Sequence, residues 1–428
     1  MASVGRRCIP LALIALAVGW LLSTISSTGD WPNDSAPAVE ALASGHVSEY
    51  LEAKAMMGSF STLVQAPFVA LAPAGDLTVY RWAAFPCVLA AGLLGLYLAA
   101  VAGRRGASVP FRVLLAALCL FNPITIAALD NGHPEEILTA SLVVGAVASA
   151  AEGRRWTPAL LLGLALASKQ WAVLAILPTL MALPSGRFRV GLAAAALAAA
   201  LTLPALIASP EAFTEVQGNA ASTGRTVTPW SVWYPTATEV TEVHRVGDTE
   251  LVATVREAPA LVGELSHPLI VLLVFALPLG LALKRRGLGL GAAEAMALLA
   301  LLALLRAALD PVDNLYYHAP LLLALLGWDA VAPPGRLPLR GLTGAAVAFL
   351  LWEWSKHLSD FDLFNVAYVA IALAGMAAIA AALSPGRAPG TRLRVDSPSS
   401  FSTDDNYWRD EAPLSGIKGI ASRSINRG

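Results

Sequence analysis

Residues 130–136 gather side chains that can form ion pairs and strong hydrogen bonds: Asp130, His133, Glu135 and Glu136. Apolar runs of membrane-spanning length lie on both sides of this stretch. Ionisable groups between two membrane spans are costly, which favours a functional site here. The alternative is a solvated loop in which the two glutamates occupy the first turn of the next helix, where the helix dipole favours carboxylates. The stretch alone does not decide between these two interpretations.

A lone lysine, Lys169, interrupts a second apolar region. The runs on its two sides, 157–168 and 170–183, are each too short to cross a membrane fully. We expect their junction to lie below the outer surface, where broken helices are tolerated only if they line a cavity or pack within protein. A lysine at that depth needs an anionic partner. The alternative is that its side chain snorkels to the outer surface.

The elements that hold these residues must be membrane helices. The chain has 428 residues, of which 56% are hydrophobic and 14% charged, and its mean hydropathy is +0.63. Soluble globular domains carry about 25% charged residues. The composition therefore predicts an all-α polytopic membrane protein, and the net charge of −1 gives no reason to expect a nucleic-acid partner. The three cysteines fall in apolar runs and imply neither a disulfide nor a zinc site.

Twelve apolar runs are predicted to span the membrane. They lie near residues 8–27, 82–103, 112–128, 135–151, 157–168, 170–183, 190–208, 267–283, 288–309, 315–332, 340–357 and 363–383. The run 60–73 is short and contains Pro67, so we expect it to be re-entrant or interfacial. Residues 385–428 are polar, and we expect them to form a disordered cytoplasmic tail after a transmembrane domain over 1–384.

Positive charge supports this alternation of spans. Every short loop on the side of the N-terminus carries arginine or lysine: Arg104, Arg105 and Arg112; Arg154 and Arg155; Arg187 and Arg189; Lys284, Arg285 and Arg286; Arg336 and Arg340; Arg387, Arg392 and Arg394. Cytoplasmic loops are enriched in these residues, so both termini are predicted to be cytoplasmic. The outer loops are then 28–59, 130–136, 168–171, 209–266, 310–318 and 356–362, and they hold most of the other ionisable residues.

Five stretches stand in a suggestive order along the chain. They are 34–50, which begins with Asp34 just after the first span, then 60–73, Gly-His-Pro-Glu-Glu-Ile-Leu at 132–138, Gly-Leu-Ala-Leu-Ala-Ser-Lys-Gln-Trp at 163–171, and 310–318, which ends in Tyr-Tyr-His. Together, over roughly residues 8–330, they resemble the GT-C class of integral-membrane glycosyltransferases, and more closely glycosyltransferase family 87. The resemblance implies a GT-C-like bundle of about twelve transmembrane helices with catalytic loops on the outer face.

The resemblance also implies an activity. Members transfer a hexose, often mannose, from a polyprenol-phosphate donor to a glycan or glycolipid acceptor outside the plasma membrane. The expected partners are therefore the lipid donor, the acceptor and the bilayer. No spacing of ligands in the sequence demands a metal, so we expect no required metal and no cofactor other than the donor substrate.

Asp34 is the candidate general base under this resemblance. One carboxylate must take the proton of the acceptor hydroxyl as that hydroxyl attacks the anomeric carbon, and the polyprenyl phosphate leaves as an anion. The alternative for Asp34 is a helix cap, because 36–44 is predicted to form a short helix. Asp30 is the second candidate, and its alternative is a turn residue beside Gly29.

The remaining candidates are binding residues. The donor phosphate is assigned to Lys169, His318, His133, Tyr317 and Arg225. The sugar is assigned to Glu135, Glu136, Asp130 and Trp171. The alternative for His133, Glu135 and Glu136 is that they orient Lys169. Aromatic belt residues with a capping histidine are the alternative for His318 and its neighbours, and exposed loop arginines such as Arg225 usually contact nothing specific. Asp310 and Asp313 are expected to cap or to pair, for instance with Arg306.

Two other functions compete with the transferase. A transporter or a flippase for lipid-linked sugars would distribute ionisable residues through the middle of the membrane and show repeat symmetry. Here they gather at one face, apart from Lys169, Glu294 and Arg306, and no internal repeat is evident. A polymer ligase would concentrate its reactive groups in one large outer loop, such as 209–266.

Overall fold

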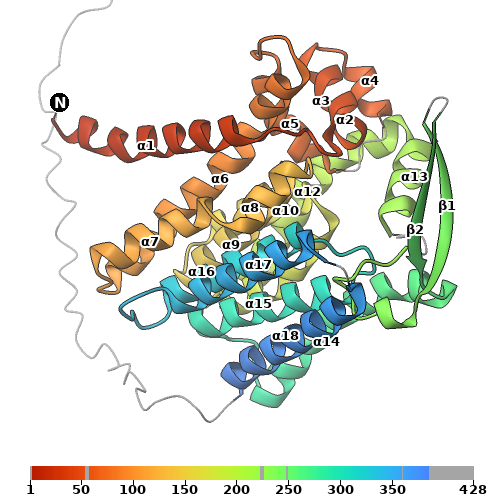
Figure 1. Cartoon of the computed structure of the whole chain (residues 1–428). Coiled ribbons are helices and arrows are strands. Elements are labelled where there is room, and N and C mark those ends of the chain that lie inside the picture. The colour runs from red at the N-terminus through yellow and green to blue at the C-terminus, as the bar shows by residue number, and fades with distance from the viewer. Residues whose placement is uncertain (1, 54–56, 222–225, 247–248, 359, 385–428) are drawn as a thin grey trace, which may run out of the picture. The chain divides into compact units, whose positions relative to one another are not determined.

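The computed structural model describes residues 2–53, 57–221, 226–246, 249–358 and 360–384 (Figure 1). The tail predicted over 385–428 lies outside these residues. One compact unit contains all the described elements. Its α-helices are α1 (Ala2–Thr24), α2 (Trp31–Asp34), α3 (Ala36–Ala43), α4 (Val47–Glu52), α5 (Ser59–Val69), α6 (Asp76–Arg104), α7 (Val109–Leu120), α8 (Pro123–Asp130), α9 (Pro134–Ala151), α10 (Trp156–Leu166), α11 (Ile176–Ala182), α12 (Arg187–Ala208), α13 (Pro210–Ala221), α14 (Ala260–Arg285), α15 (Ala292–Leu309), α16 (Ala319–Val331), α17 (Leu339–Lys356) and α18 (Phe361–Leu383). Three 3₁₀ helices are η1 (Gln170–Ala175), η2 (Tyr234–Thr236) and η3 (Leu315–His318).

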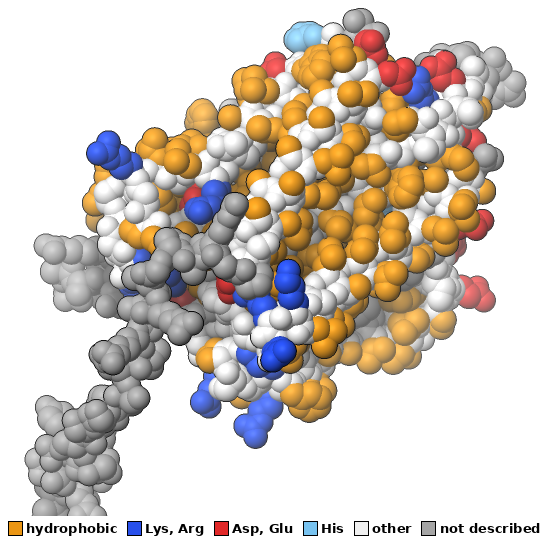
Figure 2. All heavy atoms as spheres, turned by 90° about the horizontal axis from the view of Figure 1, so that it is seen from below, with side chains coloured by type: hydrophobic (Ala, Val, Ile, Leu, Met, Phe, Trp, Pro, Cys, Tyr) orange, Lys and Arg blue, Asp and Glu red, His pale blue; other side chains and the backbone are white. Residues whose placement is uncertain are grey.

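Seven helical segments in the described part of the chain are long and apolar enough to cross a membrane. They are α6, α7 with α8, α9, α12, α14, α15 and α18. These seven segments coincide with seven of the twelve predicted spans. The other five predicted spans correspond to helices that are shorter or less apolar, namely α1, α10, η1 with α11, η3 with α16, and α17. Figure 2 shows a broad field of hydrophobic side chains on one face, as a lipid-facing surface requires. The chain is therefore a helical membrane protein.

The helices alternate between two ends of the bundle. One end, called the basic end, comprises the loops 104–108, 152–155, 183–186, 286–291 and 332–338. Two arginines join its loops and helix ends, because Arg105 Nη1 lies 2.5 Å from the carbonyl oxygen of Val331 and Arg285 Nη2 lies 2.6 Å from that of Leu383. The opposite end, called the site end, comprises 25–35, 130–134, 167–170, 310–318 and 357–362. The loops that carry these arginines thus lie together at one end of the bundle.

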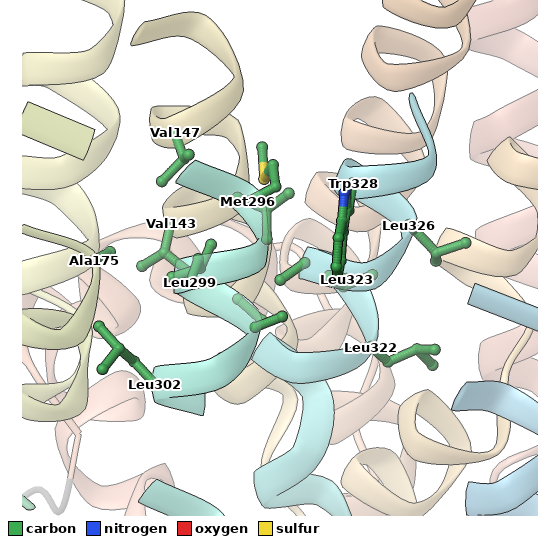
Figure 3. Close-up of a cluster of buried hydrophobic side chains, with 14 of the residues drawn as sticks. Val143, Val147, Ala175, Met296, Leu299, Leu302, Leu322, Leu323, Leu326 and Trp328 are labelled. Carbon is green, nitrogen blue, oxygen red and sulfur yellow. The ribbon is translucent and has the colours of Figure 1, made fainter. Parts of the chain in front are cut away.

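The core is built around α9, whose residues are nearly all buried. Small residues recur along this helix, so neighbouring helices approach it closely. Figure 3 shows part of the resulting cluster, to which α9 contributes Val143 and Val147, α15 contributes Met296 and Leu299, and α16 contributes Leu323 and Trp328. The cluster includes Val143, Val147, Met296, Leu299, Leu302, Leu322, Leu323, Leu326 and Trp328. Because α9 also begins with the two glutamates, the core holds the start of this helix rigidly at the site end.

The prediction of an all-α chain was incomplete in the region 209–266. Strands β1 (Thr238–Val246) and β2 (Thr249–Glu257) form an antiparallel hairpin in the region expected to be a loop. Their sequences are rich in Val and Thr, which favour strands, but the valines of β1 recur at every third residue and not in alternation. The same region also contains α13, and α14 begins at Ala260 and not near 267. Figure 1 shows the hairpin as a ribbon at the margin of the helical bundle.

Candidate functional site

A cavity of about 1090 Å³ lies at the site end. Its polar lining includes Asp30, Asp34, His133, Glu136, Lys169, Trp171, Arg306, Asp310, Tyr316 and Tyr317. A mostly apolar wall includes Thr202, Ala205, Phe213, Val216, Ile270, Val271, Leu272 and Val274, from α12, α13 and α14. Seven of the residues assigned from the sequence to catalysis or binding therefore meet in one cavity, although they come from four separate regions of the chain.

Lys169 has anionic partners in this cavity. Its Nζ lies 2.9 Å from Glu135 Oε1 and 3.3 Å from Glu136 Oε1. The chain breaks here because α10 ends at Leu166 and Lys169 itself is extended, with φ −149° and ψ 140°. The side chain of Lys169 is 16% exposed and that of Glu135 is 1% exposed. This burial argues against snorkelling and against a solvated loop at 130–136. Glu135 and Glu136 do occupy the first turn of α9, as the alternative expected, but they are buried there.

A second cation, Arg306, also lines the cavity. Its guanidinium lies over the ring of Tyr317 at 4.2 Å and over the ring of Trp171 at 5.4 Å. Trp171 in turn donates from Nε1 to Glu136 Oε2 at 2.8 Å. The carboxylate that pairs with Arg306 belongs to Asp310, at 4.0 Å. The sequence prediction treated Arg306 only as a pairing partner, and its position alone within an apolar run was the signal for a functional role.

His133 connects the glutamates to the outer loop. Its Nδ1 lies 3.2 Å from Glu135 Oε1 and its Nε2 lies 3.6 Å from Asp30 Oδ2, while its ring stacks on Tyr316. Burial disfavours the protonated ring, but the hydrogen bond to Glu135 and the charge of Glu135 outweigh burial and raise the pKa of His133. The raised pKa extends the pH range over which His133 carries a positive charge in the lining. Asp30 is 68% exposed and occupies the rim.

Asp34 is the last residue of α2 and is half-buried in the cavity wall. The N-cap of α3 is Ser35, which forms no side-chain cap hydrogen bond. The alternative role of Asp34 as the cap of this helix is therefore wrong. Burial raises the pKa of Asp34, and the positive charges of His133 and Lys169 act in the opposite direction. A carboxylate with a raised pKa is a better proton acceptor than an ordinary aspartate.

Two glycine contacts hold the outer loops against this site. Gly132 has a φ of +82°, and a Cβ there would lie 2.5 Å from the carbonyl oxygen of Thr28. Across the same contact between the two loops, the amide of Asp30 donates to the carbonyl of Asn131 at 3.1 Å. Only a glycine permits this approach of two backbones at a left-handed φ.

The second contact joins the start of α5 to the lysine loop. The amide of Gly58 donates to the carbonyl of Ser168 at 2.8 Å. A Cβ at Gly58 would lie 2.2 Å from the carbonyl oxygen of Ala167, so this position also excludes a side chain. Both glycines set the position of residues that line the cavity, and neither was identified from the sequence as a site residue.

His318 lies apart from the cavity. Its Nε2 is 3.1 Å from the hydroxyl of Tyr368 and 3.7 Å from Asp313 Oδ2, in a network that also contacts Trp230. The side chain of His318 is 8% exposed and that of Asp313 is fully enclosed. An enclosed imidazole that faces Tyr368 of α18 does not contact a ligand in the cavity. The assignment of His318 to the donor phosphate is therefore not supported by its position.

Three other assigned residues do not line the cavity. Glu135 lies behind Lys169 and is enclosed, so it acts on a ligand only through its neighbours. Asp130, the last residue of α8, is partly exposed. Arg225 lies outside the described residues. No group of three or more His, Cys, Asp or Glu side chains in the described ranges is arranged to hold a metal ion.

The lining combines two buried cations, a half-buried carboxylate with a raised pKa and an apolar wall. Arginine and lysine bind phosphate oxygens through charge-assisted hydrogen bonds. The carboxylate can accept a proton from a hydroxyl. The site is thus suited to an amphiphilic anion and a nucleophilic hydroxyl at the same time.

Comparison with known proteins assigns the chain to a family. No curated protein and no solved structure matches it. The model of glycosyltransferase family 87 matches residues 58–304, which is more than half of the chain. The match contains His133, Glu136, Lys169 and Trp171 of the cavity and begins after Asp34. The chain belongs to glycosyltransferase family 87.

Proposed function

We propose that this membrane glycosyltransferase moves a hexose, with mannose as the first candidate, from a polyprenol-phosphate donor to a glycan or glycolipid acceptor. The observation that carries the proposal is a single cavity in which Asp34, Lys169 and Arg306 meet an apolar wall. Family membership supports the transfer of a sugar. The chemistry of the lining supports a donor that is both anionic and lipidic.

The apolar wall is the basis for a lipid donor. Leu272 of α14 lines the cavity and is also 62% exposed, so the cavity wall is continuous with the outer surface of that helix. On α12, which contributes Thr202 and Ala205 to the lining, Ile207 is 75% exposed. Exposed aliphatic side chains on membrane helices contact lipid tails. A prenyl chain can therefore enter from the side while its phosphate reaches the cations.

The two cations have different roles in this proposal. Lys169 is held by two carboxylates of the chain, so much of its charge is already neutralised. Arg306 has its paired carboxylate at 4.0 Å and lies against two aromatic rings, and its Nη1 donates to the carbonyl of Tyr317 at 3.3 Å. The remaining donors of this planar guanidinium are suited to a phosphate. Arg306 is thus the main phosphate contact, and Lys169 supplements it.

The transfer step places the proton on Asp34. The acceptor oxygen attacks the anomeric carbon and forms the new glycosidic bond, while the bond from that carbon to the phosphate oxygen breaks. The polyprenyl phosphate keeps the electron pair and leaves as an anion stabilised by Arg306 and Lys169. Asp34 accepts the hydroxyl proton, and Asp30 at the rim is the alternative acceptor. Attack opposite the leaving group inverts the anomeric configuration.

The proposed orientation puts the site end outside the plasma membrane. The positive-inside rule supports cytoplasmic positions for the basic end and both termini. In this orientation all twelve helical segments cross or enter the bilayer, with α10 and η1–α11 meeting at Lys169 inside it. The acceptor then approaches from the extracytoplasmic side, where Asp30 is exposed.

The test is transfer by purified protein in nanodiscs. A labelled polyprenol-phosphate mannose pool and an envelope extract are incubated with wild type, Asp34→Asn and Asp130→Asn. Asp130 is the matched control because it is a nearby aspartate outside the cavity lining. We expect a labelled product from wild type and the control, and none from Asp34→Asn at an unchanged melting temperature. Label that crosses the bilayer of proteoliposomes without forming a product would instead identify a flippase.

A further inference from the structure

A second cavity, of about 320 Å³, lies at the basic end between the starts of α10 and α12. It is lined by Arg155, Trp156, Ser185, Gly186, Arg189 and Val190. The two helices run from this cavity toward the site end, where α10 leads to Lys169 and α12 contributes to the first cavity. The second cavity is thus separate from the proposed reaction site and shares two helices with it.

The two arginines of this cavity differ from their neighbours. Arg104 pairs with Glu152, Arg187 donates from Nε to the carbonyl of Leu180, and Arg340 pairs with Asp329. For Arg155 and Arg189, by contrast, no residue in the described ranges provides an ion pair or a hydrogen bond. Two guanidinium groups therefore border one small cavity with their donors available.

The backbone adds to this positive field. Arg155 is the N-cap of α10 and forms no side-chain cap hydrogen bond. Gly186 is the N-cap of α12, with a φ of +72°, and has no side chain to cap the helix. The first amides of both helices are therefore uncapped by a side chain, and helix N-termini favour anions.

Apolar side chains adjoin the charged cavity on the same two helices. Trp156 is 70% exposed and Leu160 is 51% exposed on α10, and Leu192 is 59% exposed on α12. Exposed tryptophan beside arginine is typical of the level at which lipid headgroups meet the hydrocarbon core. Figure 2 shows Lys and Arg side chains gathered at one margin of the hydrophobic field. The residues at and beside the cavity are therefore of the kinds found at the level of lipid phosphates.

We infer that this cavity binds the phosphate-ester headgroup of an anionic membrane lipid. Arg155 and Arg189 contact the phosphate, and the acyl chains lie along Trp156, Leu160 and Leu192. A bound lipid joins the starts of α10 and α12 and so stabilises the bundle. Basic pockets between transmembrane helices bind anionic headgroups in this way.

The experiment titrates lipid into the purified full chain in a neutral detergent and follows the melting temperature. The variants are Arg155→Gln, Arg189→Gln and the double variant. The matched control is Arg286→Gln with Arg336→Gln, which removes the same charge from the basic end but from neither of the two cavities. We expect phosphatidylglycerol to stabilise wild type and the control, and phosphatidylcholine to stabilise neither.

The expected loss of apparent affinity is roughly fivefold for each arginine and about thirtyfold for both. The single variants keep the test valid if the double variant fails to fold. Equal responses of the double variant and the control would overturn the inference. Inorganic phosphate that stabilises wild type as well as phosphatidylglycerol does would also overturn it, because the site would then hold a free anion and not a lipid.

Discussion

Gly132 is the point where the first outer loop touches the start of α9, and its substitution tests how Asp34 is positioned. A Cβ on Gly132 would lie 2.5 Å from the carbonyl oxygen of Thr28 and from the amide nitrogen of Trp31. Ordinary contact begins at 3.4 Å, and 3.4 minus 2.5 leaves about 0.9 Å by which the two backbones must separate. Gly132→Ala should therefore displace α2, with Asp34 at its end, from His133.

The size of the effect follows from this displacement. Misplacing a reacting group by about 1 Å costs on the order of 100-fold in rate, so we expect kcat/KM to fall about 100-fold in Gly132→Ala. The left-handed backbone adds about 1–2 kcal/mol of destabilisation for alanine. Gly106→Ala is the matched control, because Gly106 has a φ of +88° but no atom lies within 4 Å of the position that its Cβ would take.

The assay compares sugar transfer and melting temperature for wild type, Gly132→Ala and Gly106→Ala. Hydrogen exchange provides a readout that does not depend on the substrate, because the Asp30 amide is bonded to the Asn131 carbonyl across the same contact. We expect faster exchange at Asp30 only in Gly132→Ala. Equal activity in the two variants, or unchanged exchange at Asp30, would refute the view that this crossing positions Asp34.

Three further predictions concern charged residues in the cavity lining and directly behind it. The rate of transfer should decline as the pH falls through the pKa of Asp34, because the base must be ionised. Since burial raises this pKa, the decline of kcat at acidic pH should be centred above about 3.9, the usual pKa of an aspartate, in a pH profile. Arg306→Lys should raise KM for the donor about tenfold with a smaller change in kcat, measured by steady-state kinetics, because lysine loses the planar donors and the ring contacts. Glu135→Gln should lower the free energy of unfolding by about 3 kcal/mol in equilibrium unfolding. The double variant with Lys169→Met should lose less stability than the sum of the two single variants, because both members of the ion pair are then removed together.

The composition of the cavity was largely predictable because membrane burial makes charge expensive. The need of Lys169 for an anionic partner followed from its apolar surroundings alone. The partner expected from the sequence was the donor phosphate, whereas in the structure Glu135 and Glu136 lie against Lys169. The direction of the His318 side chain was not predictable in the same way. His318 follows Tyr316 and Tyr317, which both line the cavity, but its own ring faces the hydroxyl of Tyr368 on α18. Because η3 makes little more than one turn, its sequence does not show which of its residues face the cavity.

The hairpin and the glycine contacts were missed for other reasons. The hairpin was missed because β1 and β2 lack the strict alternation of apolar and polar residues that indicates a half-buried strand. The contact at Gly132 joins two loops that lie far apart in the chain, and none of the apolar patterns that reveal helices points to it. Contacts of this kind between distant loops are determined by the packing of whole helices, and the local sequence gives little indication of them.

Lys169 pairs with two glutamates of α9, the membrane helix that comes before α10 in the chain, and this pairing has a consequence for membrane insertion. Glu135 and Glu136 leave the ribosome before Lys169, and α10 has only 11 residues, which at 1.5 Å per residue is about half the thickness of the hydrocarbon core. The pair of short segments α10 and η1–α11, with Lys169 between them, is therefore too short and carries a charge too deep to enter a bilayer alone. We expect it to insert against α9 already in place, so that the counter-charges of the finished site also serve as its docking point during biosynthesis.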